Sequence, residues 1–294
     1  MATKEFTHLH VHTEYSMLDG AARLGDLFTH AKELGMKSMA TSDHGFLFGA
    51  FDFWRQAKAH DIKPIIGVEA YLTPGTHRTD RSRVRWGDGS RDDVSGGGAY
   101  THMTMWAETT EGMHNLFRAS SIASLEGQLY KPRMDREVLQ TYSKGLIATT
   151  GCPSGEIQTR LRLGQFDEAI QAASDFRDIF GKDNFYCEVM DHGLDIERNV
   201  QEDLHRLAKQ LNLPYVATND LHYTRQEDHT AHAALLCVQS GSTLTDPKRF
   251  KFDADNFYLR SPEEMYSIFG DIPGACENTL EIAERCNVEF NTKA

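Results

Sequence analysis

Short apolar runs alternate with amphipathic stretches along most of this chain. Seven runs rich in β-branched or aromatic residues predict strands, at 6–11, 37–41, 64–72, 102–107, 146–150, 185–190 and 215–218. Between them, apolar residues recur with helical spacing, as at Leu24, Leu27, Phe28, Ala31 and Leu34. Strands that alternate with helices indicate βαβ units and a mainly parallel sheet. The pattern therefore predicts an α/β fold, and both a closed barrel and a doubly wound open sheet satisfy it.

Two segments depart from this alternation. Residues 75–99 are rich in Gly, Arg and Asp without any apolar period, which predicts a long flexible loop after the third strand. From about Leu244 the sequence no longer follows this alternation. We interpret 1–270 as the main domain and 271–294 as a connecting segment. The chain stops at Ala294 inside that segment, which suggests a piece of a longer polypeptide.

Composition and cysteine use restrict the class of protein. Hydrophobic residues make up 40% and charged residues 25%, as in ordinary globular proteins. No stretch approaches the roughly 20 apolar residues of a membrane span, and the polar, His-rich start does not fit a signal peptide. The five cysteines are widely spaced and form no CxxC pair, which argues against disulfides and zinc fingers. We therefore expect a cytoplasmic protein.

The net charge of −12 bears on possible partners. A domain that binds nucleic acid by itself usually carries a basic surface. Either this domain never holds DNA alone, or bound cations and a neighbouring domain supply the attraction. Taken by itself, the composition favours an enzyme that acts on small molecules.

Residues of metal-ligand type lie at one end of almost every predicted strand. In chain order they are His10, His12, Asp19, Asp43, His44, Glu69, His102, Cys152, Asp220 and His222. In a parallel barrel the strand ends meet on one face, which is where active sites are built. Convergence of these scattered residues therefore favours the closed barrel over the open sheet.

The types and spacing of these residues point to a metal site. Residues two apart in a strand face the same side, so His10 and His12 can hold one ion, and Asp220 with His222 offers a second such pair. Imidazole, carboxylate and thiolate together suit zinc, manganese or iron better than calcium or magnesium. Because one ion cannot use all these ligands, we expect a multinuclear site of the kind that clamps phosphoryl oxygens.

For several other residues, an ordinary structural or supporting role is the alternative to direct metal or DNA binding. Cys152 could be an ordinary buried cysteine, although its place at a strand end favours a ligand role. His8 and Asp43 are expected to orient the ligands by hydrogen bonding. The loop arginines Arg78, Arg81 and Arg83 could contact a nucleic-acid backbone, but acidic neighbours favour a solvated loop.

Several motifs carry a family resemblance. In order they are HLHVHTEYSMLDG, TSDHGFLFGAFDFW, PIIGVEAYL, HMTMWA, GLIATTGCPSGEI and ATNDLHY, which together resemble PHP (polymerase and histidinol phosphatase) domains. FTHLHVHTEYSMLDG, TGCPSGEI and KFDADNFYLRSPEEM are similar to the N-terminal PHP domain of bacterial DNA polymerase III alpha subunits in particular. The resemblance covers essentially the whole chain and implies a distorted (β/α)7 TIM-like barrel.

The resemblance also implies a centre of three divalent metal ions, with zinc as the first choice and manganese or iron as alternatives. One ion would lie among His10, His12, Glu69 and Asp220, a second among Glu69, His102 and Cys152, and a third among Asp19, His44 and His222. Glu69 and Asp220 would be the catalytic ligands. The family pattern does not use Glu188 or His192, which implies a structural or substrate-side role for both.

The implied activity is a metal-dependent 3′–5′ exonuclease that proofreads DNA by hydrolysing the primer 3′-terminal phosphodiester. Nucleotide polymerisation would then belong to domains beyond Ala294, and the partners would be the primer end, those domains and replisome subunits such as the sliding clamp. Two alternatives stay open. One is a silent scaffold domain, and the other is a phosphatase or pyrophosphatase for small molecules.

Overall fold

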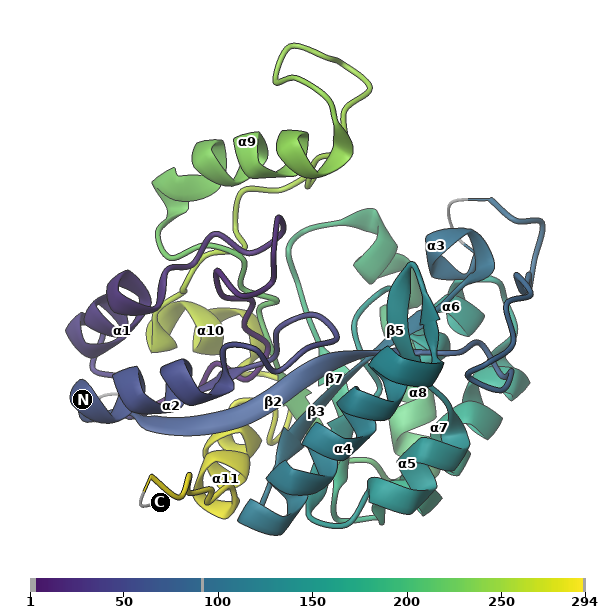
Figure 1. The fold of residues 1–294 in the computed structure, drawn as a ribbon, viewed down its shortest axis with the longest axis horizontal. Helices are drawn as coiled ribbons and strands as arrows, with labels where there is room; N and C mark the ends of the chain where they lie inside the picture. Colours follow the sequence, from purple (N-terminus) through teal and green to yellow (C-terminus); the bar gives the residue numbers. More distant parts are fainter. Residues whose placement is uncertain (1–3, 91–92, 293–294) are drawn as a thin grey trace.

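The structure is a computed structural model that describes residues 4–90 and 93–292. Its strands form a strongly curled sheet surrounded by helices (Figure 1). The long strands are β1 (Ser38–Thr41), β2 (Lys63–Leu72), β3 (Thr101–Ala107), β6 (Leu146–Thr149), β7 (Phe185–Val189) and β8 (Tyr215–Ala217). A small hairpin of β4 (Gln128–Leu129) and β5 (Lys131–Met134) extends the end of β2. Six of the seven predicted strands and the α/β class are confirmed, whereas the first predicted strand, 6–11, forms only isolated bridges.

The first predicted strand closes the sheet into a ring. His8 pairs with Met39 of β1, and Val11 pairs with Leu221 just beyond β8, both in parallel. The Leu221 N–H donates to the His10 carbonyl oxygen at 3.0 Å, and the His12 N–H donates to the Leu221 carbonyl oxygen at 2.7 Å. The fold is therefore a distorted seven-stranded TIM-like barrel, as the ring of pairings β1–β2–β3–β6–β7–β8 requires.

One strand of the barrel runs against the others. β3 is antiparallel to both β2 and β6, whereas the β1–β2, β6–β7 and β7–β8 pairs are parallel. The start of β3 consequently lies at the face where its neighbours end. This reversal explains how His102, at the beginning of its strand, reaches the same face as residues at the ends of other strands.

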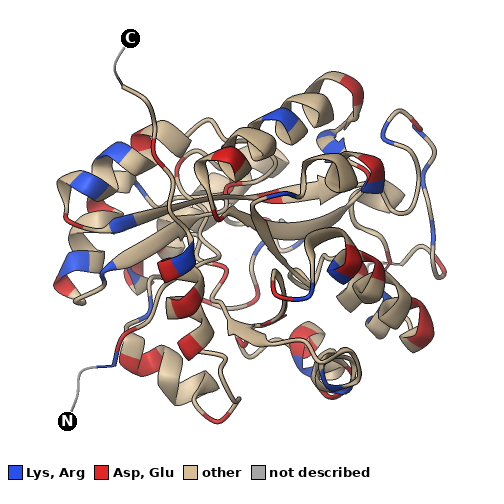
Figure 2. Cartoon of the chain, turned by 90° about the horizontal axis from the view of Figure 1, so that it is seen from below, with Lys and Arg blue, Asp and Glu red and all other residues tan. Residues whose placement is uncertain are grey.

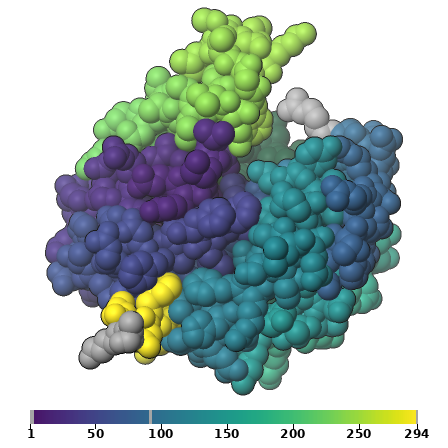
Figure 3. Space-filling view, in the orientation of Figure 1, coloured from purple at the N-terminus to yellow at the C-terminus, as the bar shows by residue number. Residues whose placement is uncertain are grey.

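Helices cover the outside of the ring (Figure 1). They are α1 (Leu24–Glu33), α2 (Ala50–Ala59), α3 (Ser95–Gly98), α4 (Thr110–Glu126), α5 (Arg136–Tyr142), α6 (Glu156–Arg162), α7 (Phe166–Phe180), α8 (Asp195–Leu211), α9 (His229–Ser240), α10 (Pro262–Phe269) and α11 (Glu277–Arg285). In α7, the buried residues Ala169, Ala172, Ala173, Phe176 and Phe180 follow helical spacing and form its inner face. The segment of α9 projects from one end of the molecule (Figure 3). None of the described helices is both long and apolar enough to cross a membrane.

One side chain from each strand of the ring fills one end of the barrel. They are Leu9, Ala40, Ile65, Trp106, Ile147, Tyr186 and Val216, all buried. The α11 residues Ile282, Ala283 and Cys286 belong to the same cluster and cover that end, although α11 lies in the predicted connecting segment. In the parallel strands the predicted ligands follow these apolar residues along the chain, as Glu69 follows Ile65 and Asp220 follows Val216, so the ligands gather at the opposite end.

The segment 75–99 has more fixed contacts than its composition suggests. The buried guanidinium of Arg133 donates to the carbonyl oxygens of Arg78 at 3.0 Å and Asp80 at 2.7 Å. The Asp93 carboxylate accepts hydrogen bonds from the backbone N–H groups of Trp86 and Gly89, each at 2.9 Å. The Arg133 contacts attach the start of the segment to β5, whereas the Asp93 contacts lie within the segment and fix its own backbone. On the outer helices, acidic and basic residues are interspersed (Figure 2).

Candidate metal centre

Nine predicted ligands lie together at the open end of the barrel, and Glu69 of β2 is at their centre. Its Oε2 atom lies 2.7 Å from His44 Nδ1, and its Oε1 atom lies 3.0 Å from His102 Nδ1 and 3.1 Å from Cys152 Sγ. Glu69 is 1% exposed. Its carboxylate can therefore bridge two cations that these neighbours would hold.

Asp220 joins the two histidines of the first strand. Its Oδ1 atom lies 3.3 Å from His10 Nε2 and 3.2 Å from His12 Nε2. The residue has a φ of 43°, in the left-handed region that Asp and Asn tolerate better than most side chains. This conformation after β8 turns the carboxylate into the barrel.

Asp19 connects the remaining histidines. Its Oδ2 atom lies 2.6 Å from His44 Nε2 and 3.6 Å from His222 Nε2. The rings of His44 and His222 both lie against that of His12, with centroid separations of 4.1 and 4.4 Å. At this end of the barrel three sets of side chains have the geometry to hold a cation, namely His10–His12–Asp220, His44–Glu69–His102 and His12–His44–His222. A fourth such set among the described residues, His77–Asp135–Glu137, includes two exposed residues.

Buried atoms without hydrogen bonds support cation binding here. Among the described residues, His10 Nε2, His12 Nε2, His44 Nδ1 and Glu69 Oε2 are buried and form no hydrogen bond of regular geometry, although a carboxylate oxygen or imidazole nitrogen lies 2.7–3.3 Å from each. Buried polar atoms are normally paired, and each unpaired one is costly. Imidazole, carboxylate and thiolate ligands suit zinc or a similar transition metal, so the residues present fit such ions.

The electrostatics of the site also favour cations. Burial alone would raise the pKa of Glu69, but the positive charges of His102 and His44 hold it well below its usual range. Burial is likewise outweighed at Asp19, where hydrogen bonds from His222 and His44 keep the carboxyl pKa low. Burial and the charge of Glu69 raise the pKa of the Cys152 thiol. Ionised carboxylates thus crowd a buried space, and a bound cation would neutralise them and deprotonate the thiol.

The predicted supporting role of Asp43 has a structural counterpart. Its carboxylate accepts hydrogen bonds from the Thr13 N–H at 2.7 Å, the Ser16 hydroxyl at 2.9 Å and the Thr41 hydroxyl at 3.1 Å. The Ser16 oxygen in turn lies 3.0 Å from His12 Nδ1 and accepts from the His44 backbone N–H at 3.1 Å. Asp43 therefore acts on the histidines through Ser16.

The prediction for His8 was wrong. The Nε2 atom of His8 lies 2.8 Å from the Arg260 carbonyl oxygen. Within the described part of the chain, His8 forms no hydrogen bond with any of the nine predicted ligands. The prediction assumed regular alternation between His8 and His10. The chain instead bends at His10, and Leu9 belongs to the interior layer, so His8 faces away from the site.

Sequence reasoning underestimated Glu188. This residue of β7 is fully buried, and its Oε1 atom lies 2.7 Å from His10 Nδ1. The hydroxyls of Thr149 and Thr218 donate to it at 2.5 and 2.8 Å. The available signal was a glutamate inside the apolar run FYCEV. His192 contacts Glu197 at 2.6 Å and the Asn219 carbonyl oxygen at 2.8 Å, as a structural residue would.

The loop arginines differ in what they contact. Arg78 is committed to ion pairs with Glu126, Asp135 and Glu137, which corrects the expectation of a free DNA contact. Arg83 donates to the Tyr130 hydroxyl at 2.9 Å and to the carbonyl oxygens of the 96–97 segment. Arg81 makes no ion pair or hydrogen bond with a described residue. Arg91, in the same loop, lies outside the described residues.

A cavity of about 370 Å³ opens onto the predicted ligands. Its floor includes Asp19, Glu69 and Asp220, and Phe250 and Phe252 line it from the segment that follows α9. A ligand in this cavity would therefore meet carboxylates and imidazoles on one side and aromatic rings on the other.

Comparison with known proteins shows which sequences this chain is similar to. The family described as PHP domain matches residues 8–192. DNA polymerase III subunit alpha of Saccharopolyspora erythraea is 58% identical over 295 residues, covering 97% of this chain and 25% of that protein. The corresponding proteins of Mycobacterium tuberculosis H37Rv and Campylobacter jejuni are 55% and 42% identical, covering 97% and 98% of this chain and 24% of each relative. The chain thus spans about a quarter of the length of these relatives.

Solved structures resemble this one more distantly. An amidohydrolase from Chromobacterium violaceum gives a TM-score of 0.43 at 13% identity, covering 74% of this chain and 87% of that one. A putative metal-dependent phosphoesterase from Bifidobacterium adolescentis gives 0.36 at 13% identity, covering 76% and 88%. The fold assignment rests on the strand pairings described above, not on these scores.

Proposed function

This chain belongs to the PHP domain family, and we propose that its metal centre hydrolyses phosphodiesters, removing nucleotides from the 3′ end of a DNA primer. The observation that carries the proposal is the convergence of nine ligand-type side chains with unpaired buried atoms at one end of the barrel. Such an arrangement has little other physical reason to exist, because leaving buried polar atoms unpaired destabilises a fold.

The proposed ligand sets follow the contacts of the site. His10, His12, Glu69 and Asp220 would hold one ion, Glu69, His102 and Cys152 a second, and Asp19, His44 and His222 a third. Zinc is the first choice, with manganese or iron as alternatives. When bound, such ions would supply Lewis-acid chemistry, which lowers the pKa of water and neutralises phosphate oxygens. Glu69 and Asp220 are assigned the catalytic role because their carboxylates reach the most neighbours.

The chain's own residues fix the geometry that this chemistry needs. Glu188 orients His10, and Ser16 orients His12, so that both Nε2 atoms face the carboxylates. Phe250 and Phe252 shield one side of the cavity from water. Preorganised ligands of this kind lower the cost of reorganisation when the phosphate reacts.

DNA as the substrate is proposed from the relatives. They are DNA polymerase III alpha subunits about four times as long as this chain. We therefore assign polymerisation to other domains of such a polypeptide, with residues 1–270 as the hydrolytic domain and 271–294 as the connection. The cytoplasm as its location and the sliding clamp as a partner belong to the same proposal.

Small-molecule phosphatase activity is the second candidate, because the net charge is −12. A small-molecule site is expected to be a closed cup. Here the cavity at the ligands shares His102 and Ser154 with a neighbouring cavity, which favours a groove for an extended substrate. The intact ligand set counts against a silent scaffold.

The test is 3′-end degradation of a mismatched primer–template by the intact polymerase polypeptide, with Asp220→Asn alongside. Asparagine keeps the size of the side chain and tolerates the left-handed backbone at this position, so the fold should survive. We expect the wild type to shorten the primer and the variant not to shorten it. Retention of the primer by both, with metal bound stoichiometrically, would favour the scaffold.

A further inference from the structure

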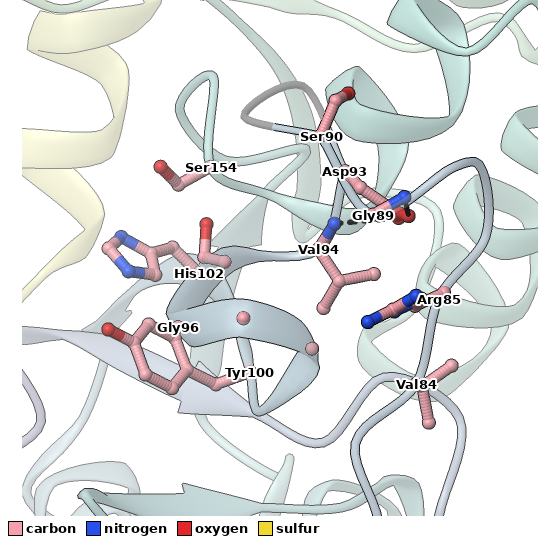
Figure 4. A pocket seen from close by; sticks show the side chains of 13 residues that line it. Val84, Arg85, Gly89, Ser90, Asp93, Val94, Gly96, Tyr100, His102 and Ser154 are labelled. Carbon is pink, nitrogen blue, oxygen red and sulfur yellow. Dashed lines mark hydrogen bonds between the residues drawn. The ribbon is translucent and has the colours of Figure 1, made fainter.

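A second cavity adjoins the metal centre, and we call it the Arg85–Tyr100 pocket. It has a volume of about 500 Å³, and its lining includes Arg85, Gly96, Tyr100, His102 and Ser154 (Figure 4). His102 and Ser154 also line the cavity over the predicted ligands. The volume is in the range of ligand sites, roughly 300–1,000 Å³. A substrate at the metal centre could therefore extend directly into this pocket.

Tyr100 provides a fixed aromatic wall. Its ring stacks on that of His102, with centroids 5.7 Å apart and planes 22° apart, and packs edge-on against Tyr71 at 4.8 Å. Its hydroxyl forms no hydrogen bond with any described residue. Because His102 and the Gly96 backbone lie against the ring, the part of Tyr100 that lines the pocket offers a nucleobase an aromatic edge.

Arg85 provides a free positive charge. It is exposed, forms no ion pair or hydrogen bond within the described part of the chain, and lines the pocket with its guanidinium directed inward (Figure 4). An arginine fork suits the bidentate recognition of phosphate. Asp93 also lines the pocket, but its carboxylate accepts four backbone N–H bonds, from Trp86, Gly87, Gly89 and Val94.

Glycines keep the remaining wall bare. Gly96, Gly97 and Gly98 have φ values of 61°, 63° and 94°, which L side chains rarely adopt. A Cβ atom at Gly96 would lie 2.4 Å from the Tyr100 ring, and one at Gly98 would lie 2.4 Å from the Val84 carbonyl oxygen. The close approach of this backbone to Tyr100 therefore requires glycine.

We propose that the Arg85–Tyr100 pocket binds the nucleotide next to the phosphodiester that is hydrolysed. Arg85 pairs with the phosphate of that nucleotide, and the edge of the Tyr100 ring packs against its base. The inference deepens the proposed function and rests on it, since it names single-stranded DNA as the form in which the substrate enters. Neither contact reads a particular base, so the pocket accepts any sequence.

The test measures binding without turnover. A short single-stranded oligothymidylate with phosphorothioate linkages and a 5′ fluorescein is titrated with the 294-residue chain in the presence of manganese, and anisotropy is recorded. We expect Arg85→Gln and Tyr100→Leu to weaken binding about tenfold. Arg85→Gln should also reduce the slope of log Kd against log salt by about 0.7, as expected for one lost phosphate contact.

Two matched variants separate the pocket from general charge and packing effects. Arg81→Gln removes a charge from the same exposed segment but outside the pocket, and Tyr100→Phe keeps the ring, so each should change Kd by about twofold at most. Equal effects of Arg85→Gln and Arg81→Gln, or no binding by the wild type, would overturn the inference. Hydrolysis of bis(p-nitrophenyl) phosphate by the wild type tests the metal centre separately. Failure of that reaction alone would reject the proposed function and not the nucleotide pocket.

Discussion

His10 Nδ1 and Glu188 Oε1 lie 2.7 Å apart in a pair whose side chains are both fully buried. The contact assigns the proton of the imidazole to Nδ1, because a carboxylate oxygen accepts and cannot donate. His10 Nε2 faces Asp220 Oδ1 at 3.3 Å and Glu69 Oε1 at 3.6 Å. Burial alone would lower the pKa of His10, but the charges of Asp220 and Glu188 raise it well above its ordinary value, so without a cation Nε2 also holds a proton, which a bound cation would replace. Glu188 thus determines which His10 nitrogen is available as a ligand.

This relationship predicts the effect of Glu188→Gln. An amide in place of the carboxylate weakens the hold on the His10 tautomer, and metal affinity should fall by about 10- to 100-fold. Competition with a zinc-chelating dye measures the change. Glu168→Gln, at an exposed position on α7, is the control and should bind metal normally. Equal zinc retention by both variants would show that Glu188 does not act on the ligands.

Metal removal should lower stability. The ionised carboxylates of Asp19, Glu69 and Asp220 share a small buried space, and without cations they depend on the histidines alone for neutralisation. A free-ion concentration of 100 times Kd should stabilise the fold by about 2.7 kcal/mol. Urea unfolding with chelator and after zinc addition measures this difference. An unchanged midpoint, despite confirmed loss of zinc, would mean that the ions do not support the fold.

Gly67→Ala should destabilise the barrel. A Cβ atom there would lie 2.4 Å from the Trp106 ring and 2.5 Å from the Met105 carbonyl oxygen, at the β2–β3 pairing. Overpacking of this kind costs about 1–3 kcal/mol or more. The free energy of unfolding measures the loss. At Gly25 in α1 a Cβ atom would meet only Gln56 Oε1, at an ordinary contact distance of 3.9 Å, so Gly25→Ala should instead stabilise by about 0.5–1 kcal/mol. A similar result for both variants would contradict the steric explanation.

Stability should depend on pH through His205 of α8. Burial lowers the pKa of His205 below its ordinary value of 6.5, so the folded state favours the neutral ring. This contribution is fully present above pH 6.5 and is lost as the pH falls through the folded-state pKa. His205→Gln should therefore lose less stability than the wild type between roughly pH 8 and pH 5. The free energy of unfolding is measured by urea denaturation of both proteins at each pH. An equal loss for the wild type and for His205→Gln would refute this assignment.

The sequence predicted the barrel well because local pattern carries the information. The run 64–72 became β2 (Lys63–Leu72), since a strand buried on both sides must be apolar along its length. Helical spacing marked α1 in the same way. The metal-ligand types were likewise visible, because imidazole, thiolate and carboxylate side chains are unusual at the ends of apolar strands.

The antiparallel direction of β3 was not predicted, because the strand pattern of apolar residues is the same in both directions. The bend of the chain at His10 was not predicted either, and it turns His8 away from the site. The ion pairs of Arg78 depend on Glu126 and Asp135, which are distant in sequence and come near only when β5 docks on β2.

The sequence by itself therefore determined the class of fold, the order of its strands and the kinds of side chain at their ends, because periodicity and residue chemistry are local properties. The tertiary structure alone decided which of those side chains meet. His10 and Glu188 are separated by 178 positions, and their contact exists only because the barrel closes between the first strand and the segment after β8. No local pattern records such a distance, since it is set by the packing of strands around a common interior.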